Sequence, residues 1–301
     1  MHGFVIISHD NPPQLEALCA VLTKLYDNPP IVCHHDFSQS KIDRSRFAAT
    51  VTFVEHPRKT GWGAWNVTAG VLRAIEFMYQ DRGPDWFTLL SAVDYPVKPA
   101  AYVYRKLEAA NVDAFMDLRP MNRPPPTRHV GQKDAGLDHH SNVPLATRRY
   151  LHARLQMPKG NFDGQPRTIR LPFASPFNPF NEEYHCYVGS QWFTANRRCA
   201  QRLINLSKQD ETLRAYMQRR WHADECFVNT VLGNARELRI EVNPYRYTQW
   251  RQMAASPEWL DLEDLAKISS SEAFFARKIS IGSPLIQRLD HLLGCEPILF
   301  Y

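Results

Sequence analysis

The chain has 301 residues, 22% of them charged, and a net charge of +5. This length suits one large α/β domain or two small ones. The weak positive charge does not argue for a nucleic-acid binder, although it permits an anionic ligand. No apolar run reaches the ~18 residues that a membrane-spanning helix needs. Because Met1-His2-Gly3-Phe4 enters a predicted strand at once, we expect no signal peptide.

The first part of the chain alternates strand and helix patterns. Short apolar and β-branched runs predict strands, and apolar residues at helical spacing predict helices between them. Strands and helices in this order are typical of a mostly parallel sheet covered by helices. The predicted strands are 4–7, 31–33, 51–54, 86–90 and 114–116, and the predicted helices are about 15–25, 65–79 and 100–110.

The strand at 86–90 leads into Ser91-Ala92-Val93-Asp94-Tyr95-Pro96. In α/β proteins a buried strand that ends in small and acidic residues often delivers a loop to the carboxyl edge of the sheet, where ligands bind. A core strand followed by a proline turn is the alternative interpretation.

Residues 119–183 break the alternation, because Pro124-Pro125-Pro126 and the residues around it show no periodicity. A segment of this length without clear elements is usually a functional excursion or disordered. Its aromatic residues favour packing over the carboxyl edge of the sheet. Regular patterns resume at 187–193, and a further helix is predicted to open near Trp221–Phe227.

The six cysteines are scattered and form no Cys-x-x-Cys pair, so we expect reduced, buried thiols in a cytoplasmic protein. Two histidine pairs, His34-His35 and His139-His140, resemble metal ligands. Adjacent side chains on a strand point to opposite faces, however, so neither pair readily shares one ion. No metal site is therefore predicted.

Glu225 is the candidate catalytic carboxylate. It is predicted to lie in the first turn of a helix beside Asp224, where the helix dipole keeps a carboxylate ionised. An ionised carboxylate at the edge of a cleft can act as a general base toward a hydroxyl. The alternative is that Glu225 only caps the helix, as acidic residues in first turns often do.

Arg277-Lys278, with Arg251 upstream, could clamp a diphosphate. A solvated basic turn is the alternative interpretation. Neither Gly-x-Gly-x-x-Gly nor Gly-x-x-x-x-Gly-Lys-Ser/Thr occurs, which argues against a nicotinamide enzyme or a P-loop nucleotidase. Asp-x-Asp is also missing, so side-chain cations would have to neutralise a bound diphosphate.

Four tryptophans can stack on sugar rings or bases, although buried core positions are the commoner role for this residue. They are Trp62, Trp65, Trp192 and Trp250.

Taken in order, six blocks of the sequence resemble the core-2/I-branching β-1,6-N-acetylglucosaminyltransferase and protein xylosyltransferase family, glycosyltransferase family 14. Each block alone is weak, but their shared order from residue 31 to residue 278 is specific. The blocks are Ile31–Asp36 with its final His-His-Asp, Trp62-Gly63-Ala64, Ser91–Lys98, Gly189-Ser190-Gln191-Trp192-Phe193, Asp224–Leu232 and Phe275-Ala276-Arg277-Lys278.

The resemblance implies a GT-A-like fold, an inverting mechanism and no metal cofactor. Within one glycosyltransferase domain, residues 1–118 would form the nucleotide-binding half, 119–183 an irregular acceptor-side excursion and 184–301 the acceptor and catalytic half. Glu225 would be the general base. Asp36, Trp62, Ser91, Asp94, Arg277 and Lys278 would bind the UDP-sugar, with Asp36 on the uridine and the basic pair on the diphosphate. Trp192, Asp224 and Trp250 would bind the acceptor.

We therefore expect an inverting, metal-independent glycosyltransferase that moves GlcNAc or xylose from a UDP-sugar to a glycan or glycolipid. Animal members carry a membrane anchor, a stem and disulfides that this sequence does not match. This difference favours a bacterial-type cytoplasmic enzyme that can rest on the membrane face and has no nucleic-acid partner. The alternative is a catalytically silent module of the same fold that binds nucleotides or glycans.

Overall fold

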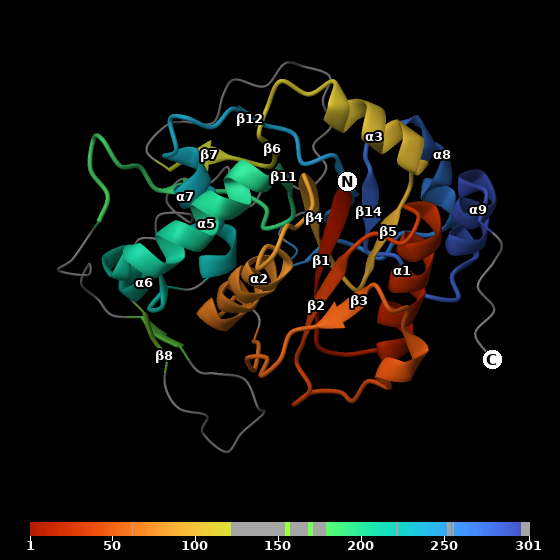
Figure 1. Ribbon diagram of the computed structural model, residues 1–301, viewed down its shortest axis with the longest axis horizontal. Coiled ribbons are helices and arrows are strands. Elements are labelled where there is room, and N and C mark those ends of the chain that lie inside the picture. Colours follow the sequence, from red (N-terminus) through yellow and green to blue (C-terminus); the bar gives the residue numbers. More distant parts are fainter. Residues whose placement is uncertain are drawn as a thin grey trace.

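The computed structural model describes residues 1–61, 63–121, 154–156, 168–170, 179–220, 222–251, 254 and 256–295. A seven-stranded sheet crosses the middle of this structure (Figure 1), with the strand order β12-β6-β11-β4-β1-β2-β3. Its strands are β1 (His2–Ser8), β2 (Ile31–His35), β3 (Val51–Phe53), β4 (Trp86–Ser91), β6 (Ala114–Phe115), β11 (Thr194–Asn196) and β12 (Ile240–Glu241).

Most neighbours in this sheet run parallel. β1 pairs in parallel with β2 and β4, and β2 with β3. β11 lies between β4 and β6 and is antiparallel to both. β1 is buried along its whole length because both faces of the sheet are covered, which explains its continuous apolar sequence. The predicted mostly parallel α/β architecture is confirmed.

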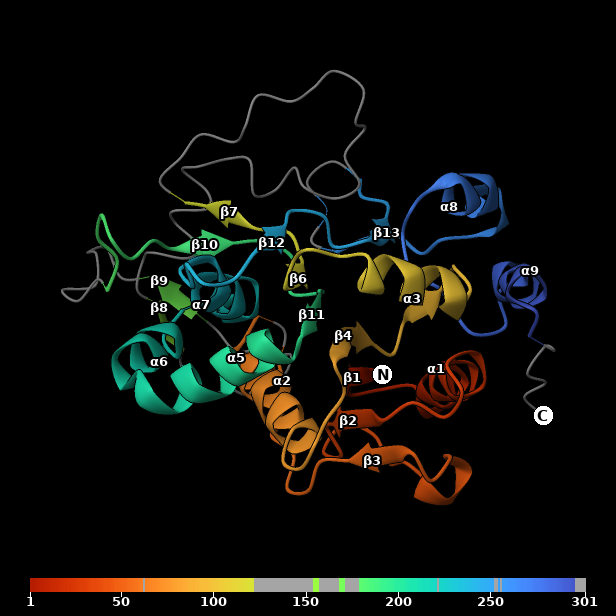
Figure 2. The ribbon, with the colours of Figure 1, turned by 45° about the horizontal axis from the view of Figure 1, so that its top comes forward.

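Helices cover the sheet in two groups, one on each face (Figure 2). Val5 and Ile7 of β1 pack into one hydrophobic core, and Phe4 and Ile6 into the other. One group is α2 (Trp65–Met78), α5 (Arg197–Gln209), α6 (Glu211–Met217) and α7 (Phe227–Gly233). The other is α1 (Pro12–Leu25), α3 (Ala100–Glu108), α8 (Leu265–Ser270) and α9 (Pro284–Leu293).

The three helices predicted in the first part of the chain are confirmed as α1, α2 and α3. α1 begins with prolines in its first turn, where no intrahelical hydrogen bond is lost. Leu15, Leu18 and Leu22 then bury one side of α1 against the sheet. Short 3₁₀ helices occur at η1 (Arg44–Arg46), η2 (Ala223–Glu225) and η3 (Leu262–Asp264).

A second, three-stranded sheet joins distant parts of the chain. Its order is β13 (Arg246–Thr248), β14 (Phe275–Arg277) and β5 (Asp94–Pro96). β5 occupies the stretch for which the sequence predicts a loop or a proline turn, so that prediction is wrong. Pro96 is accepted in β5 because β5 is an edge strand, where a missing N–H costs no ladder bond. The pairing partner of β5 lies about 180 residues later, beyond the reach of any local pattern.

Most of the excursion at 119–183 lies outside the described residues, including Phe173 and Phe177 of the aromatic residues predicted to pack over the sheet. Phe180 and Tyr184 are described, and both pack against the hydrophobic core, with the ring centroid of Phe180 5.4 Å from that of Tyr216 in α6. Of the described part, β7 (Arg119–Pro120) pairs with β10 (Tyr187–Val188). The backbone of β8 (Arg154–Gln156) pairs with that of β9 (Thr168–Arg170).

All six cysteines are buried free thiols, as the sequence predicts. Two pairs of them come close: the sulfur atoms are 3.4 Å apart in Cys186 and Cys226 and 4.0 Å apart in Cys19 and Cys33. Within the described ranges, none of the helices is long and apolar enough to cross a lipid bilayer.

Candidate active site

Three of the predicted donor residues, Asp36, Ser91 and Asp94, lie at the carboxyl edge of the large sheet. In the strand register Ser8 of β1 pairs with His35 of β2, and Ile7 pairs with Ser91 of β4. Asp36 follows directly after β2, so Asp36 and Ser91 flank the end of β1. This is the edge where ligands bind in open α/β sheets.

Asp36 is buried, and its carboxylate organises the loops around it. Its oxygens accept hydrogen bonds from the Ser38 amide and hydroxyl, from Gln39 Nε2 at 2.6 Å, and from the Thr60 amide at 2.6 Å. Burial alone would raise the pKa of Asp36, but these hydrogen bonds outweigh burial and hold the pKa below its usual range. Asp36 therefore stays ionised and joins the turn at Ser38-Gln39 to the loop at Thr60. Its contact with uridine remains a prediction.

Asp94 is completely buried, and both of its oxygens have partners. Oδ2 accepts hydrogen bonds from the amide and the hydroxyl of Ser91, each at 2.6 Å. Oδ1 accepts from Nη1 of Arg246 at 2.7 Å. A direct contact between Asp94 and a donor sugar would require this network to open.

Arg277 lies directly across from Asp94 in the register between β5 and β14. Its guanidinium carbon is 4.2 Å from the ring centroid of Trp192, within the range of a cation–π contact. Among the described residues the Arg277 side chain has no hydrogen-bond or ion-pair partner, and its Nε is buried. Burial lowers the pKa of Arg277 to about 10, while the charge of Asp94 acts to raise the pKa and that of Arg246 to lower it. Arg277 is therefore a charged group whose N–H donors have no partner among the described residues.

Lys278 is the second predicted phosphate ligand. Its amide donates to the Glu258 carbonyl at 3.3 Å, and its carbonyl accepts from the Leu260 amide at 2.7 Å. These two bonds place Lys278 beside the exposed Trp259, with Nζ 5.6 Å from the ring centroid. Burial and the neighbouring Arg277 charge lower the pKa of Lys278.

Glu225 lies in η2, and α7 begins only at Phe227. The prediction that Glu225 occupies the first turn of an α-helix is therefore wrong, because Glu225 precedes α7 and its N-cap residue Cys226. The Glu225 side chain is 21% exposed, and its Oε2 is 3.7 Å from Nδ1 of the buried His222. His222 has left-handed backbone angles, and its amide donates to the Gly63 carbonyl at 2.8 Å. The carboxylate thus sits at the surface of a turn that the protein interior holds in place.

Gly189 ties this turn to the rest of the site. Its amide donates to the Glu225 carbonyl at 3.0 Å. A Cβ on Gly189 would overlap the Asp117 carbonyl oxygen and lie 2.7 Å from Asn229 Nδ2, so only glycine fits. Trp192 follows three residues later, and three residues span at most ~11 Å. The segment 189–192 therefore contacts both parts of the site: Gly189 bonds to the turn that carries Glu225, and Trp192 packs against Arg277.

Asp224 is a buried carboxyl with an unusual environment. Its Oδ1 is buried without a hydrogen-bond partner. Burial raises the pKa of Asp224 to about 6, against a smaller decrease from backbone hydrogen bonds. Since the folded-state pKa lies above the unfolded value, the folded protein loses stability as the pH rises from about 4 to about 6.

We predict that Asp224→Asn stabilises the protein at neutral pH. Asn has the same shape and carries no charge that burial would penalise. The expected gain in the free energy of unfolding is up to about 3 kcal/mol at pH 7.5, and it should shrink toward zero at pH 4. Urea unfolding of both proteins at the two pH values measures this gain. A variant that is less stable than the parent at both would show that the Asp224 carboxylate is not penalised by burial.

The remaining predicted residues are placed as follows. Trp62 lies outside the described residues. Trp250 is partly buried two residues beyond the end of β13, and Trp192, predicted to bind the acceptor, lies under Arg277. Sequence reasoning missed Arg246 and His222. An arginine between two tyrosines in a short strand, as in Tyr245-Arg246-Tyr247, was the available signal, because a buried arginine requires a partner.

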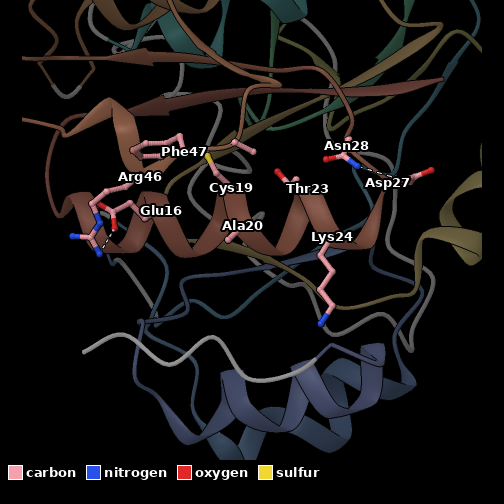
Figure 3. A pocket seen from close by; sticks show the side chains of 10 residues that line it. Glu16, Cys19, Ala20, Thr23, Lys24, Asp27, Asn28, Arg46 and Phe47 are labelled. Carbon is pink, nitrogen blue, oxygen red and sulfur yellow. Dashed lines mark hydrogen bonds and ion pairs between the residues drawn. The ribbon is translucent and has the colours of Figure 1, made fainter.

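A cavity of about 330 Å³ lies against α1 (Figure 3). Its charged lining includes Glu16 and Arg46, which pair with each other at 2.9 Å. None of the predicted site residues lines this cavity, so it is not the candidate active site. Across the residues with described side chains, no three or more His, Cys, Asp or Glu side chains gather as a metal-binding group.

Comparison with known proteins gives one family and several distant structures. A family model described as "Core-2/I-Branching enzyme" matches residues 31–273. The chain is similar to the crystal structure of the galactosyltransferase LgtC in complex with donor and acceptor sugar analogues, at 10% identity and a TM-score of 0.38, covering 99% of this chain and 97% of that one. It is also similar to mouse xyloside xylosyltransferase 1 in its apo form, at 10% identity and a TM-score of 0.35, covering 94% and 99%.

A nucleoside-diphosphate-sugar pyrophosphorylase from Vibrio cholerae matches at 11% identity and a TM-score of 0.32, covering 79% of this chain and 90% of that one. Likeness at this level supports no functional argument. No curated protein matches the chain.

Proposed function

Because the chain is a glycosyltransferase of the Core-2/I-Branching enzyme family, we propose that it transfers a sugar from a UDP-sugar to a hydroxyl group of a glycan or glycolipid. The proposal includes a GT-A-like fold, an inverting reaction and independence of divalent metal. GlcNAc and xylose are the donor sugars that the family resemblance favours.

The unpaired guanidinium of Arg277 is the observation that carries this proposal. A buried charge is costly unless it is paired, and here the donors of Arg277 have no partner among the described residues. A diphosphate would supply the missing anion, because guanidinium forms paired hydrogen bonds with phosphate oxygens. Lys278 adjoins it and adds a second cation.

In the proposed reaction Glu225 accepts the proton of the acceptor hydroxyl. The acceptor oxygen then bonds to the anomeric carbon from the face opposite UDP, and the bond between that carbon and the diphosphate oxygen breaks. Negative charge develops on the leaving diphosphate, where Arg277 and Lys278 stabilise it. His222, 3.7 Å from Glu225, helps to orient the carboxylate.

A screen of UDP-sugars tests the function. A ligand at 100 times its Kd stabilises the folded state by ~2.7 kcal/mol, so thermal unfolding with UDP-GlcNAc, UDP-xylose and UDP-glucose ranks the donors. Release of UDP from the best donor, with and without a panel of glycosides, then measures hydrolysis and transfer. Binding without any UDP release would favour the catalytically silent module.

We predict that EDTA leaves the rate of UDP release unchanged, because Arg277 and Lys278 provide the positive charge that a metal ion would otherwise supply. The rate is measured with excess EDTA and again after adding Mn²⁺ or Mg²⁺. Strict dependence on either ion would refute metal independence while leaving the family assignment intact.

A further inference from the structure

The partner of Asp94 is not the residue that its strand pairing favours. β5 and β14 place Asp94 directly opposite Arg277. Side chains at such positions have Cβ atoms ~4.5–5.5 Å apart, and opposite charges there usually pair. Asp94 instead pairs with Arg246 at 2.7 Å, and Arg277 forms no ion pair within the described part of the chain.

Arg246 reaches Asp94 from the next strand. β13 pairs with β14 so that Arg246 adjoins Phe275, two residues before Arg277. The Arg246 guanidinium also donates to the Leu89 carbonyl at 3.1 Å and lies 5.1 Å from the Phe275 ring centroid. With a side chain only 3% exposed, Arg246 is fixed by Asp94, Leu89 and Phe275 together.

Two buried guanidinium groups therefore lie near one carboxylate, that of Asp94. Asp94 forms its ion pair with Arg246, so the positive charge of Arg277 is not neutralised by an ion pair. The contact with Trp192 brings no carboxylate or other acceptor oxygen to Arg277, and among the described residues no side-chain N–H group of Arg277 donates a hydrogen bond. These donors remain available for an oxyanion, which can accept two of them at once.

We propose that Arg246 is a positioning residue: by occupying Asp94, it prevents the cross-strand ion pair between Asp94 and Arg277 and so reserves Arg277 for the diphosphate of the donor. This inference rests on the proposed function, because it assumes that Arg277 binds the diphosphate. In a protein without Arg246, Asp94 could form an ion pair with Arg277 on the neighbouring strand.

Calorimetry with UDP and with uridine tests this role, because uridine lacks the diphosphate. Arg246→Gln should lower the affinity for UDP about 10- to 100-fold, the effect of losing a charged hydrogen-bonding partner. The affinity for uridine should stay unchanged. Arg246→Gln combined with Asp94→Asn should restore UDP binding, since the competing carboxylate is gone. Arg246→Lys, which keeps a cation beside Asp94, should lie close to the parent protein.

Arg198→Gln is the matched control, because Arg198 also pairs with a buried carboxylate, Asp113, at 2.8 Å and is not a predicted site residue. It should leave both affinities unchanged. Equal losses for UDP and uridine in Arg246→Gln would show general structural damage and overturn the inference. Unchanged UDP affinity, or no rescue by Asp94→Asn, would also overturn it.

If Arg246→Gln does not fold, Asp94→Asn alone tests the same relation. It removes the competing charge, so UDP affinity should hold or rise, and a tenfold fall would contradict the role of Arg246. A parent protein that binds UDP no more tightly than uridine would refute the diphosphate role of Arg277 itself, and with it both proposals. Tight UDP binding with an insensitive Arg246 would refute only the inference about Arg246.

Discussion

Glu225→Gln is expected to lower the rate of sugar transfer by several orders of magnitude and to leave UDP binding intact. The amide keeps the size of the side chain but cannot accept the proton of the acceptor hydroxyl. A positioned general base contributes ~10²–10⁴-fold to a rate, so we expect a fall of that size in kcat. The rate of transfer and the Kd for UDP, measured on the same preparation, check the two halves of this prediction.

Glu237→Gln provides the matched control, since Glu237 is an exposed glutamate that is not among the predicted site residues. It should change neither quantity. Turnover that is undiminished in Glu225→Gln would remove Glu225 from the mechanism. Loss of UDP binding in the same variant would instead show that the turn at η2 supports the donor site.

Arg277→Ala should weaken UDP binding and slow transfer more than Lys278→Ala does. Removing a preorganised donor to developing negative charge typically costs ~10²–10³ in rate, and Arg277 is the more buried of the two cations. Lys278 is partly solvated, so the screening of its charge by water reduces its contribution. We expect about a tenfold loss of kcat/KM for Lys278→Ala.

The Kd for UDP and kcat/KM for the donor are measured for both variants, with Lys267→Ala as the control for loss of a mostly exposed lysine. Lys267→Ala should behave as the parent protein. If both site variants bind UDP as tightly as the parent does, the basic pair has no role at the diphosphate. A larger loss in Lys278→Ala would reverse the proposed order.

The elements that could be predicted from the sequence are those whose information is local. α1 and α2 repeat apolar residues at helical spacing, and β1 and β4 are short apolar runs. The antiparallel β11 and the edge strand β5 could not be predicted, because each depends on partners far along the chain. The sequence pattern also does not distinguish η2 from the first turn of α7, because η2 ends only two residues before α7 begins.

In the candidate site, too, some features could be predicted from the sequence and others could not. Its motifs identified Asp36, Asp94, Glu225 and Arg277 as positions of interest. They did not reveal that Arg246 pairs with Asp94, which lies 152 residues away. They also did not reveal that Trp192 packs against Arg277. Contacts of this kind follow from sheet register, which a short motif does not specify.

The pairing of β5 with β14 also determines when the site can form during synthesis. The large sheet can begin to assemble from β1, β2 and β4, all within the first 91 residues. Arg277, however, can lie opposite Asp94 only after residues 275–277 have left the ribosome, and bringing together strands about 180 residues apart has an entropic cost that local contacts do not have. If Arg277 binds the donor as proposed, donor binding should therefore be a late event in folding. A nascent or truncated chain that ends before β14 should contain much of the sheet but lack Arg277, the proposed diphosphate ligand.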